Sequence, residues 1–204
     1  MARFALLSIA LVMCVLAGCT SVFDRESDGL FEEGGPLSEE EQAEVKEQIA
    51  NLSAAASPED PDAEAVFNDA VQNLTLRGSS IEPLLIEALA GSEDWAIRYG
   101  VINVLDGVGT RSSVEPLIAV LDDNHYLVAL KAMYLLRVIC DHQEIPNEGV
   151  SANGLPAVPP ANPDDLDVDA WMKSWIRWHD KHGTALRETW AEWWRVHSGR
   201  VIIE

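Results

Sequence analysis

The sequence predicts an all-α fold: a short α-solenoid of helical hairpins, followed by a Trp-rich C-terminal helical pair. Three observations support this prediction. Apolar residues recur at helical spacing in several segments, the middle of the chain repeats itself after 31 to 33 residues, and six of the seven tryptophans follow residue 170. Side chains three and four positions apart share one face of a helix, so each of these segments predicts an amphipathic helix.

The first two helices are expected between Ser38 and Gly78. Ser38 is followed three residues later by Glu41, the pattern of a capping box at the start of a helix. Asp62 is expected to cap the second helix, which Gly78 ends. The apolar stripes comprise Val45, Ile49, Leu52 and Ala56 in the first helix and Ala63, Val66, Phe67, Ala70 and Leu74 in the second.

Two repeat units follow. Residues 79–85 (Ser-Ser-Ile-Glu-Pro-Leu-Leu) return as residues 112–118 (Ser-Ser-Val-Glu-Pro-Leu-Ile), and the helical pattern of residues 95–102 returns at 126–133. Each unit predicts a short helix with proline in its first turn, a polar turn and a longer apolar helix. Because such units bury their apolar faces by stacking, the leucines at equivalent places are expected in a common core: Leu84, Leu105, Leu117 and Leu136.

The repeat motifs resemble those of the HEAT-repeat family. The resemblance lies in Glu-Pro-Leu at 82–84 and 115–117 and in Asp94 to Arg98; the second unit departs from it with Ala129 in place of the arginine. It covers roughly residues 62–141 and implies that residues 37–141 form stacked helical pairs whose surface binds a protein partner. A generic array of helical hairpins is the alternative.

Residues 1–18 have the parts of an export signal. Arg3 precedes an apolar run from Phe4 to Leu16, which is too short to span a bilayer comfortably. The run closes with Leu-Ala-Gly-Cys at 16–19, which resembles the lipobox of bacterial lipoproteins. That resemblance implies cleavage before Cys19, acylation of Cys19 (palmitate or a similar chain), and a lipid-anchored protein of the bacterial cell envelope. An ordinary signal peptide with an incidental cysteine is the alternative.

The residue after Cys19 is not aspartate, which by the same resemblance indicates the outer membrane, facing the periplasm. Residues 19–36 predict a flexible acidic tether with a reach on the order of 20–25 Å. Residues 142–167 predict a Pro/Gly-rich loop. The net charge of −20 argues against nucleic acid as a partner, and against adhesion of the protein body to anionic lipid.

Residues 168–204 predict a Trp-rich cap of two short helices that meet at Gly183. We expect its rings to close the open end of the repeats; the alternative is a binding platform for a partner or for glycan. The candidate partner-binding residues are Trp171, Trp175, Trp178, Trp190, Trp193 and Trp194. His179, His182 and His197 are expected to pack or to face solvent rather than to bind a metal, since zinc needs more ligands at workable spacing.

The sequence contains no recognisable catalytic, phosphate-binding or metal-binding motif, so neither an enzyme nor a cofactor is expected. Cys140 ends an apolar helix and is expected to be buried. The functional prediction is a membrane-anchored envelope lipoprotein that acts as a protein-binding scaffold or adaptor. A cell-wall glycan-binding accessory that uses the C-terminal tryptophans is the alternative, and the sequence leaves the oligomeric state open.

Overall fold

The computed structural model describes residues 37–57, 59–140, 168–199 and 201. This part of the chain is helical throughout and contains no β-strand, which confirms the predicted all-α fold. The α-helices are α2 (Glu39–Asn51), α3 (Ala63–Leu76), α4 (Glu82–Gly91), α5 (Trp95–Val108), α6 (Val114–Ala119), α7 (Tyr126–Ile139) and α8 (Val168–His197). Short 3-10 helices lie within three of the connections between these α-helices: Leu52–Ala56, Gly78–Ile81 and Arg111–Ser113.

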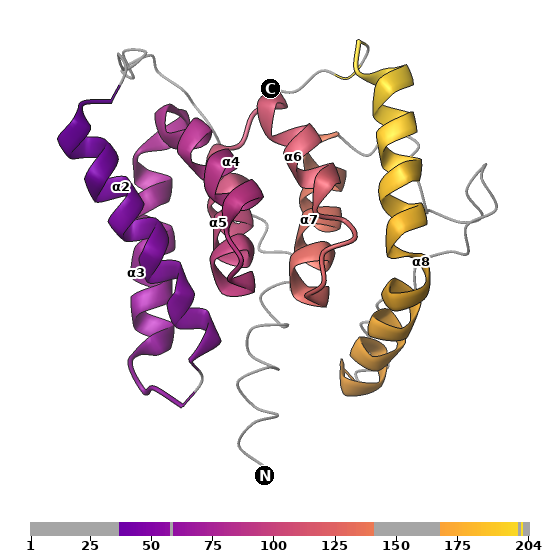
Figure 1. The fold of residues 1–204 in the computed structure, drawn as a ribbon, viewed down its shortest axis with the longest axis horizontal. Coiled ribbons are helices and arrows are strands. Elements are labelled where there is room, and N and C mark those ends of the chain that lie inside the picture. The colour runs from indigo at the N-terminus through magenta and orange to yellow at the C-terminus, as the bar shows by residue number, and fades with distance from the viewer. Residues whose placement is uncertain (1–36, 58, 141–167, 200, 202–204) are drawn as a thin grey trace.

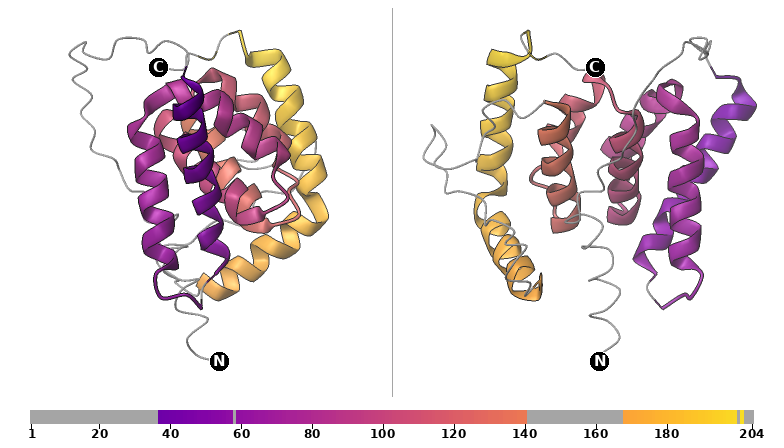
Figure 2. Two further views of the ribbon diagram at one scale, coloured as in Figure 1. Left: turned by 60° about the vertical axis from the view of Figure 1, so that its left-hand side comes forward. Right: turned by 180° about the vertical axis from the view of Figure 1, so that it is seen from behind.

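The helices from α2 to α7 form three antiparallel hairpins, stacked side by side in chain order (Figure 1). The first helices of the hairpins (α2, α4, α6) line one face and the second helices (α3, α5, α7) line the other, as Figure 2 shows from behind. Turns within the hairpins (59–62, 92–94 and 120–125) lie at one edge, which we call the hairpin-turn edge. The links between hairpins (77–81 and 109–113) lie at the opposite edge, the connector edge.

Capping explains where several helices begin and end. Ser38 forms the predicted capping box: its Oγ accepts a hydrogen bond from the Glu41 N–H at 3.2 Å, and the Glu41 carboxylate accepts one from the Ser38 N–H at 2.8 Å. The Asp94 carboxylate accepts a bond from the Ala96 N–H at 2.9 Å. Gly78 follows α3 with φ of 69°, a conformation that glycine adopts without strain. Asp62 stands at the start of α3, but its side chain makes no capping bond.

One continuous apolar core runs through the stack. Leu105, Leu117 and Leu136 are buried in it as predicted, whereas Leu84 is half-buried at its margin. Helix α5 lies very close to the first hairpin: a Cβ built at Gly100 would come within 2.8 Å of the Leu52 side chain. Glycine at this position therefore permits the close approach between α5 and the turn that follows α2.

Two buried polar residues tie the second hairpin to the third. The Glu82 carboxylate, at the start of α4, accepts hydrogen bonds from the backbone N–H of Thr110 at 2.9 Å and from the hydroxyls of Thr110 and Ser113. Arg98 in α5 pairs with Asp123, with Nε to Oδ2 at 2.6 Å and Nη2 to Oδ1 at 2.8 Å. Both residues belong to the repeat motifs, and in each case the bond reaches the next unit.

The C-terminal segment corrects one prediction. Residues 168–197 form a single helix of 30 residues, α8, and not two helices separated at Gly183. Gly183 lies within this helix, and the imidazole of His179 packs against its backbone. A Cβ at position 183 would stand 2.9 Å from His179 Nε2. The missing side chain thus makes room for a ring and does not form a turn, although the ribbon of α8 bends along its length (Figure 2).

Candidate functional site

Helix α8 closes the open end of the stack with its tryptophans. Trp175 and Trp190 have no exposed surface and Trp178 and Trp194 are buried, so four of the six candidate partner-binding tryptophans pack within the protein core. Trp171 and Trp193 are half-buried. The burial agrees with the interpretation of these rings as core, and only Trp171 and Trp193 retain surface that a partner could contact.

Polar bonds from the turn of the third hairpin and from the start of α7 fix the position of α8. The His179 ring donates from Nε2 to the carbonyl of Leu121 at 2.9 Å, since that oxygen can only accept. Trp175 Nε1 donates to the carbonyl of Tyr126 at 3.3 Å. Arg187 pairs with Asp122 at 2.9 Å. These contacts place the first half of α8 beside the hairpin-turn edge.

Arg111 holds the other end of α8. Its guanidinium donates to the backbone carbonyls of Ser198 and Val201 and lies over the Trp194 ring, 4.8 Å from the centroid. Because α6 begins near Ser198 and ends near His179, α8 runs antiparallel to α6. A regular further repeat would begin with a helix parallel to α6, so α8 terminates the array and does not extend it.

An aromatic stack lies on the hairpin-turn edge between the second and third hairpins. The His125 ring stacks on Trp95 with centroids 3.8 Å apart, and on Tyr126 at 5.0 Å. All three rings are half-exposed. Burial lowers the pKa of His125, and the nearby Asp123 carboxylate partly opposes this shift. The stack therefore presents a rigid, largely uncharged aromatic surface within an acidic edge.

A cleft of about 310 Å³ adjoins this stack, between the turn of the third hairpin and α8. Its polar lining includes Asp122, Asp123, Asn124, Asp180 and Thr184. Arg187 and Arg98 already pair with Asp122 and Asp123. The cleft is therefore a polar groove at the surface, and two of its carboxylates are already paired with arginines of the same chain.

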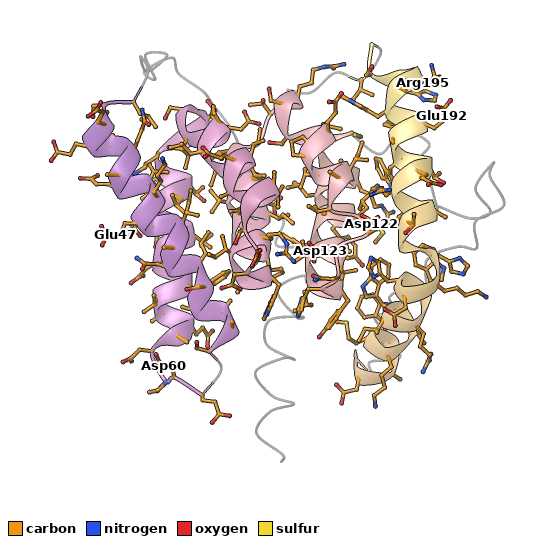
Figure 3. All side chains as sticks on the ribbon, viewed as in Figure 1. Glu47, Asp60, Asp122, Asp123, Glu192 and Arg195 are labelled. Carbon is orange, nitrogen blue, oxygen red and sulfur yellow. The ribbon has the colours of Figure 1, made fainter. Side chains whose placement is uncertain are left out.

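Charge is distributed unevenly between the two edges. The turns at the hairpin-turn edge contain no lysine or arginine, but carry Glu59, Asp60, Asp62, Glu93, Asp94, Asp122 and Asp123. The two links at the connector edge contain no acid and carry Arg77 and Arg111. Figure 3 shows Asp60 at the far end of the first hairpin, Asp122 beside α8, and Asp123 between the second and third hairpins. The strongest negative potential of the repeat domain is thus expected along the hairpin-turn edge.

The histidines of α8 take packing roles. His179 is buried against α6, the His182 ring is tilted against that of Trp178 with centroids 5.3 Å apart, and the His197 ring stacks on that of Trp193 with centroids 4.9 Å apart. Within the described ranges, no three His, Cys, Asp or Glu side chains gather closely enough to hold a metal ion.

Cys140 is buried at the end of α7, as predicted. Burial raises the pKa of its thiol to about 11, with nearby Arg111 acting in the opposite direction. A thiol with so high a pKa is a poor nucleophile at neutral pH, because the thiolate is the reactive form.

The predicted lipidation site, Cys19, lies outside the described residues, as do the signal peptide and the tether. The loop at 142–167 also lies outside them. Among the described helices, none combines the length and the hydropathy needed to cross a membrane.

Sequence reasoning missed several residues that the structure brings together. Asp123, the partner of Arg98, stands in a polar turn and has no counterpart in the first unit, so the repeat pattern did not mark it. The aromatic stack was also missed, although Trp95 and Tyr126 occupy equivalent places in the two units. Their alignment at the starts of α5 and α7 was the available signal.

Comparison with protein-family models, with curated proteins and with solved structures found no match for this chain. The structure itself defines the class of fold: an all-α stack of helical hairpins closed by a Trp-rich helix.

Proposed function

We propose that the protein is a lipid-anchored lipoprotein of the bacterial cell envelope, acting as a non-enzymatic scaffold that binds a protein partner through its repeat domain. The anchor is Cys19, and the expected location is the outer membrane, facing the periplasm. The observation that carries the binding role is the hairpin-turn edge, where acidic turns surround a half-exposed aromatic stack on a rigid helical support.

The rigidity of this edge supports binding without a large ordering cost. Arg98, Asp123 and the ring stack hold the two turns in register, so a partner would meet a preformed surface. Aromatic side chains are enriched at the energetic centres of interfaces, and here Trp95 and Tyr126 would form that centre. The acids around them favour a basic partner and disfavour nucleic acid.

The glycan-binding alternative relied on the C-terminal tryptophans and receives less support. Four of those rings are buried, and a sugar stacks only on an exposed ring face. We therefore place the partner-binding surface at Trp95, Tyr126 and the neighbouring acids.

Affinity purification after cross-linking in native membranes tests the proposal. The full chain should enrich a basic envelope protein reproducibly, and Trp95→Ala combined with Glu93→Lys should reduce that enrichment several-fold. Glu47→Lys on α2 is the matched control, because it makes the same charge change at an exposed site away from the stack.

The outcomes separate the parts of the proposal. Equal loss with Glu47→Lys would mean that overall charge, and not this surface, attracts the partner. Undiminished enrichment with the double variant would place the binding surface elsewhere. Release of the wild-type chain from membranes by a high-salt wash would contradict the lipid anchor.

A further inference from the structure

The exposed apolar side chains of the protein are not scattered. Among the described residues, the large hydrophobic side chains with the most exposure are Leu76 at 75%, Val138 at 60% and Val196 at 52%. Single exposed apolar residues are common on soluble proteins and need no explanation. These three, however, all stand within the last two residues of a helix: α3, α7 and α8, respectively.

The three helix ends lie at the same edge of the molecule. The end of α3 contacts the end of α5, where a Cβ at Gly107 would stand 2.7 Å from the methyl group of Thr75. Arg111, between α5 and α6, contacts the end of α8. Figures 1 and 2 show α3, α5, α7 and α8 all ending toward the connector edge.

Each exposed apolar residue is adjacent to an arginine. The pairs are Leu76 with Arg77, Arg137 with Val138, and Arg195 with Val196. Cations at helix C-termini are favourable because they face the negative end of the helix dipole. That effect accounts for the arginines but not for the apolar neighbours, which would gain by burial.

The chain also enters the described domain at this edge. Leu37 precedes α2, whose start lies beside the end of α3, as the ion pair of Glu44 with Arg77 at 2.6 Å shows. Residues 20–36 join Leu37 to Cys19, the anchoring residue of the proposed function. The edge with the apolar–arginine pairs is thus the one nearest in sequence to the membrane anchor.

From these observations, and resting on the proposed lipid anchor, we infer that the connector edge lies on the lipid bilayer surface on the side of the second helices. Leu76, Val138 and Val196 enter the interfacial region there. Arginine suits this position, because its aliphatic stem covers apolar surface while the guanidinium remains among the headgroups. The anchor holds the protein to the membrane, and the edge sets its orientation.

The charge distribution favours the same orientation. The acidic turns occupy the opposite edge, so they point away from anionic headgroups when the connector edge faces the bilayer. Glu39, Glu40 and Glu41 begin α2 at the connector edge, but on the face of the first helices. Their negative charge disfavours contact of the α2 side with anionic headgroups. The edge is therefore expected to meet the bilayer through the ends of α3, α7 and α8. The partner-binding surface then faces away from the membrane.

Site-specific photocross-linking tests the inference. A photoreactive phenylalanine analogue is introduced at position 76, 138 or 196 of the lipidated chain, reconstituted in vesicles of phosphatidylcholine and phosphatidylglycerol. Position 66 is the matched control: Val66 is exposed at 41%, apolar and on α3, but it lies in the first turn, about 15 Å from Leu76 along the helix. We expect lipid adducts at 76, 138 and 196, and at most a small fraction of that yield at 66.

Each other outcome contradicts the inference. Equal adducts at 66 and 76 would show that the chain has no preferred orientation. An absence of adducts at 76, 138 and 196 on a chain that floats with the vesicles would overturn the orientation while leaving the anchor intact. A chain that does not float would overturn the anchor as well. The same variants are also irradiated in native membranes, where adducts to a protein instead of lipid would overturn the inference and make this edge a protein interface.

Discussion

The buried ion pair between Arg98 and Asp123 provides a sharp test of the stacked arrangement. Their side chains are 9% and 7% exposed, and the guanidinium also donates to the Asn124 side chain and to the Ser92 carbonyl. Arg98→Ala would leave the Asp123 carboxylate buried without its counter-charge, which typically costs about 3–5 kcal/mol. Because a domain of this kind is stable by only about 5–15 kcal/mol, the variant should lose a large share of its free energy of unfolding.

Urea unfolding of the chain from residue 20 onward, followed by tryptophan fluorescence, measures this loss. Arg177→Ala on the exposed face of α8 is the control, and should change the free energy of unfolding by about 0.5 kcal/mol or less. In the wild type, Asp123 Oδ1 accepts a hydrogen bond from the backbone N–H of His125 at 2.8 Å. Asp123→Asn removes the charge but keeps an oxygen that can accept this bond. In that background Arg98→Ala should cost less than in the wild type. A loss below about 1 kcal/mol in the wild-type background would refute the argument that this pair joins the hairpins.

Four further expectations follow from the contacts described above. Cys19→Ala should abolish membrane fractionation, and persistence of the variant in salt-washed membranes would contradict the acyl anchor. Gly183→Ala should destabilise the protein despite a gain of about 1 kcal/mol in helix propensity, because the new methyl displaces the His179 ring; urea unfolding measures the sign. Burial raises the pKa of Cys140 to about 11 from 9.0, so its contribution to stability is complete below pH 9 and is lost as pH rises through 11; a Cys140→Ala variant should lack this decline. The tryptophans of α8 should emit at short wavelength and resist iodide quenching, and free quenching would show that the cap is open in solution.

The local features of the repeat domain could be predicted from the sequence. Ser38 with Glu41 predicts a capping box because the two residues are close together in the chain, and Leu105, Leu117 and Leu136 are predicted to be buried because they occupy apolar positions of the repeated helices. Leu84 shows the limit of this approach. It carries the repeat motif but lies at the margin of the core, since the neighbouring Leu85 takes the buried position in α4.

What the sequence could not supply is long-range pairing. Gly183 stands between two tryptophan stripes, which predicts a turn between two helices, but in the structure the ring of His179 occupies the space that glycine leaves. That need becomes visible only when α8 lies against α6. The polar bonds of Glu82 and Arg98 were missed for the same reason, because their partners lie 25 to 31 residues away.

The docking site of α8 has a consequence for the length of the array. The polar contacts described above that hold α8 come from the third hairpin and from the link that precedes it: Arg111, the Leu121 carbonyl, Asp122 and the Tyr126 carbonyl. A duplicated copy of residues 109–140, inserted after the original, would carry these four groups with it. The original Glu115 would then stand where Glu82 stands now, facing a new threonine and serine, while Ala129 would supply no counterpart to Arg98. The repeat array can thus lengthen one hairpin at a time while its closing helix keeps these four polar contacts.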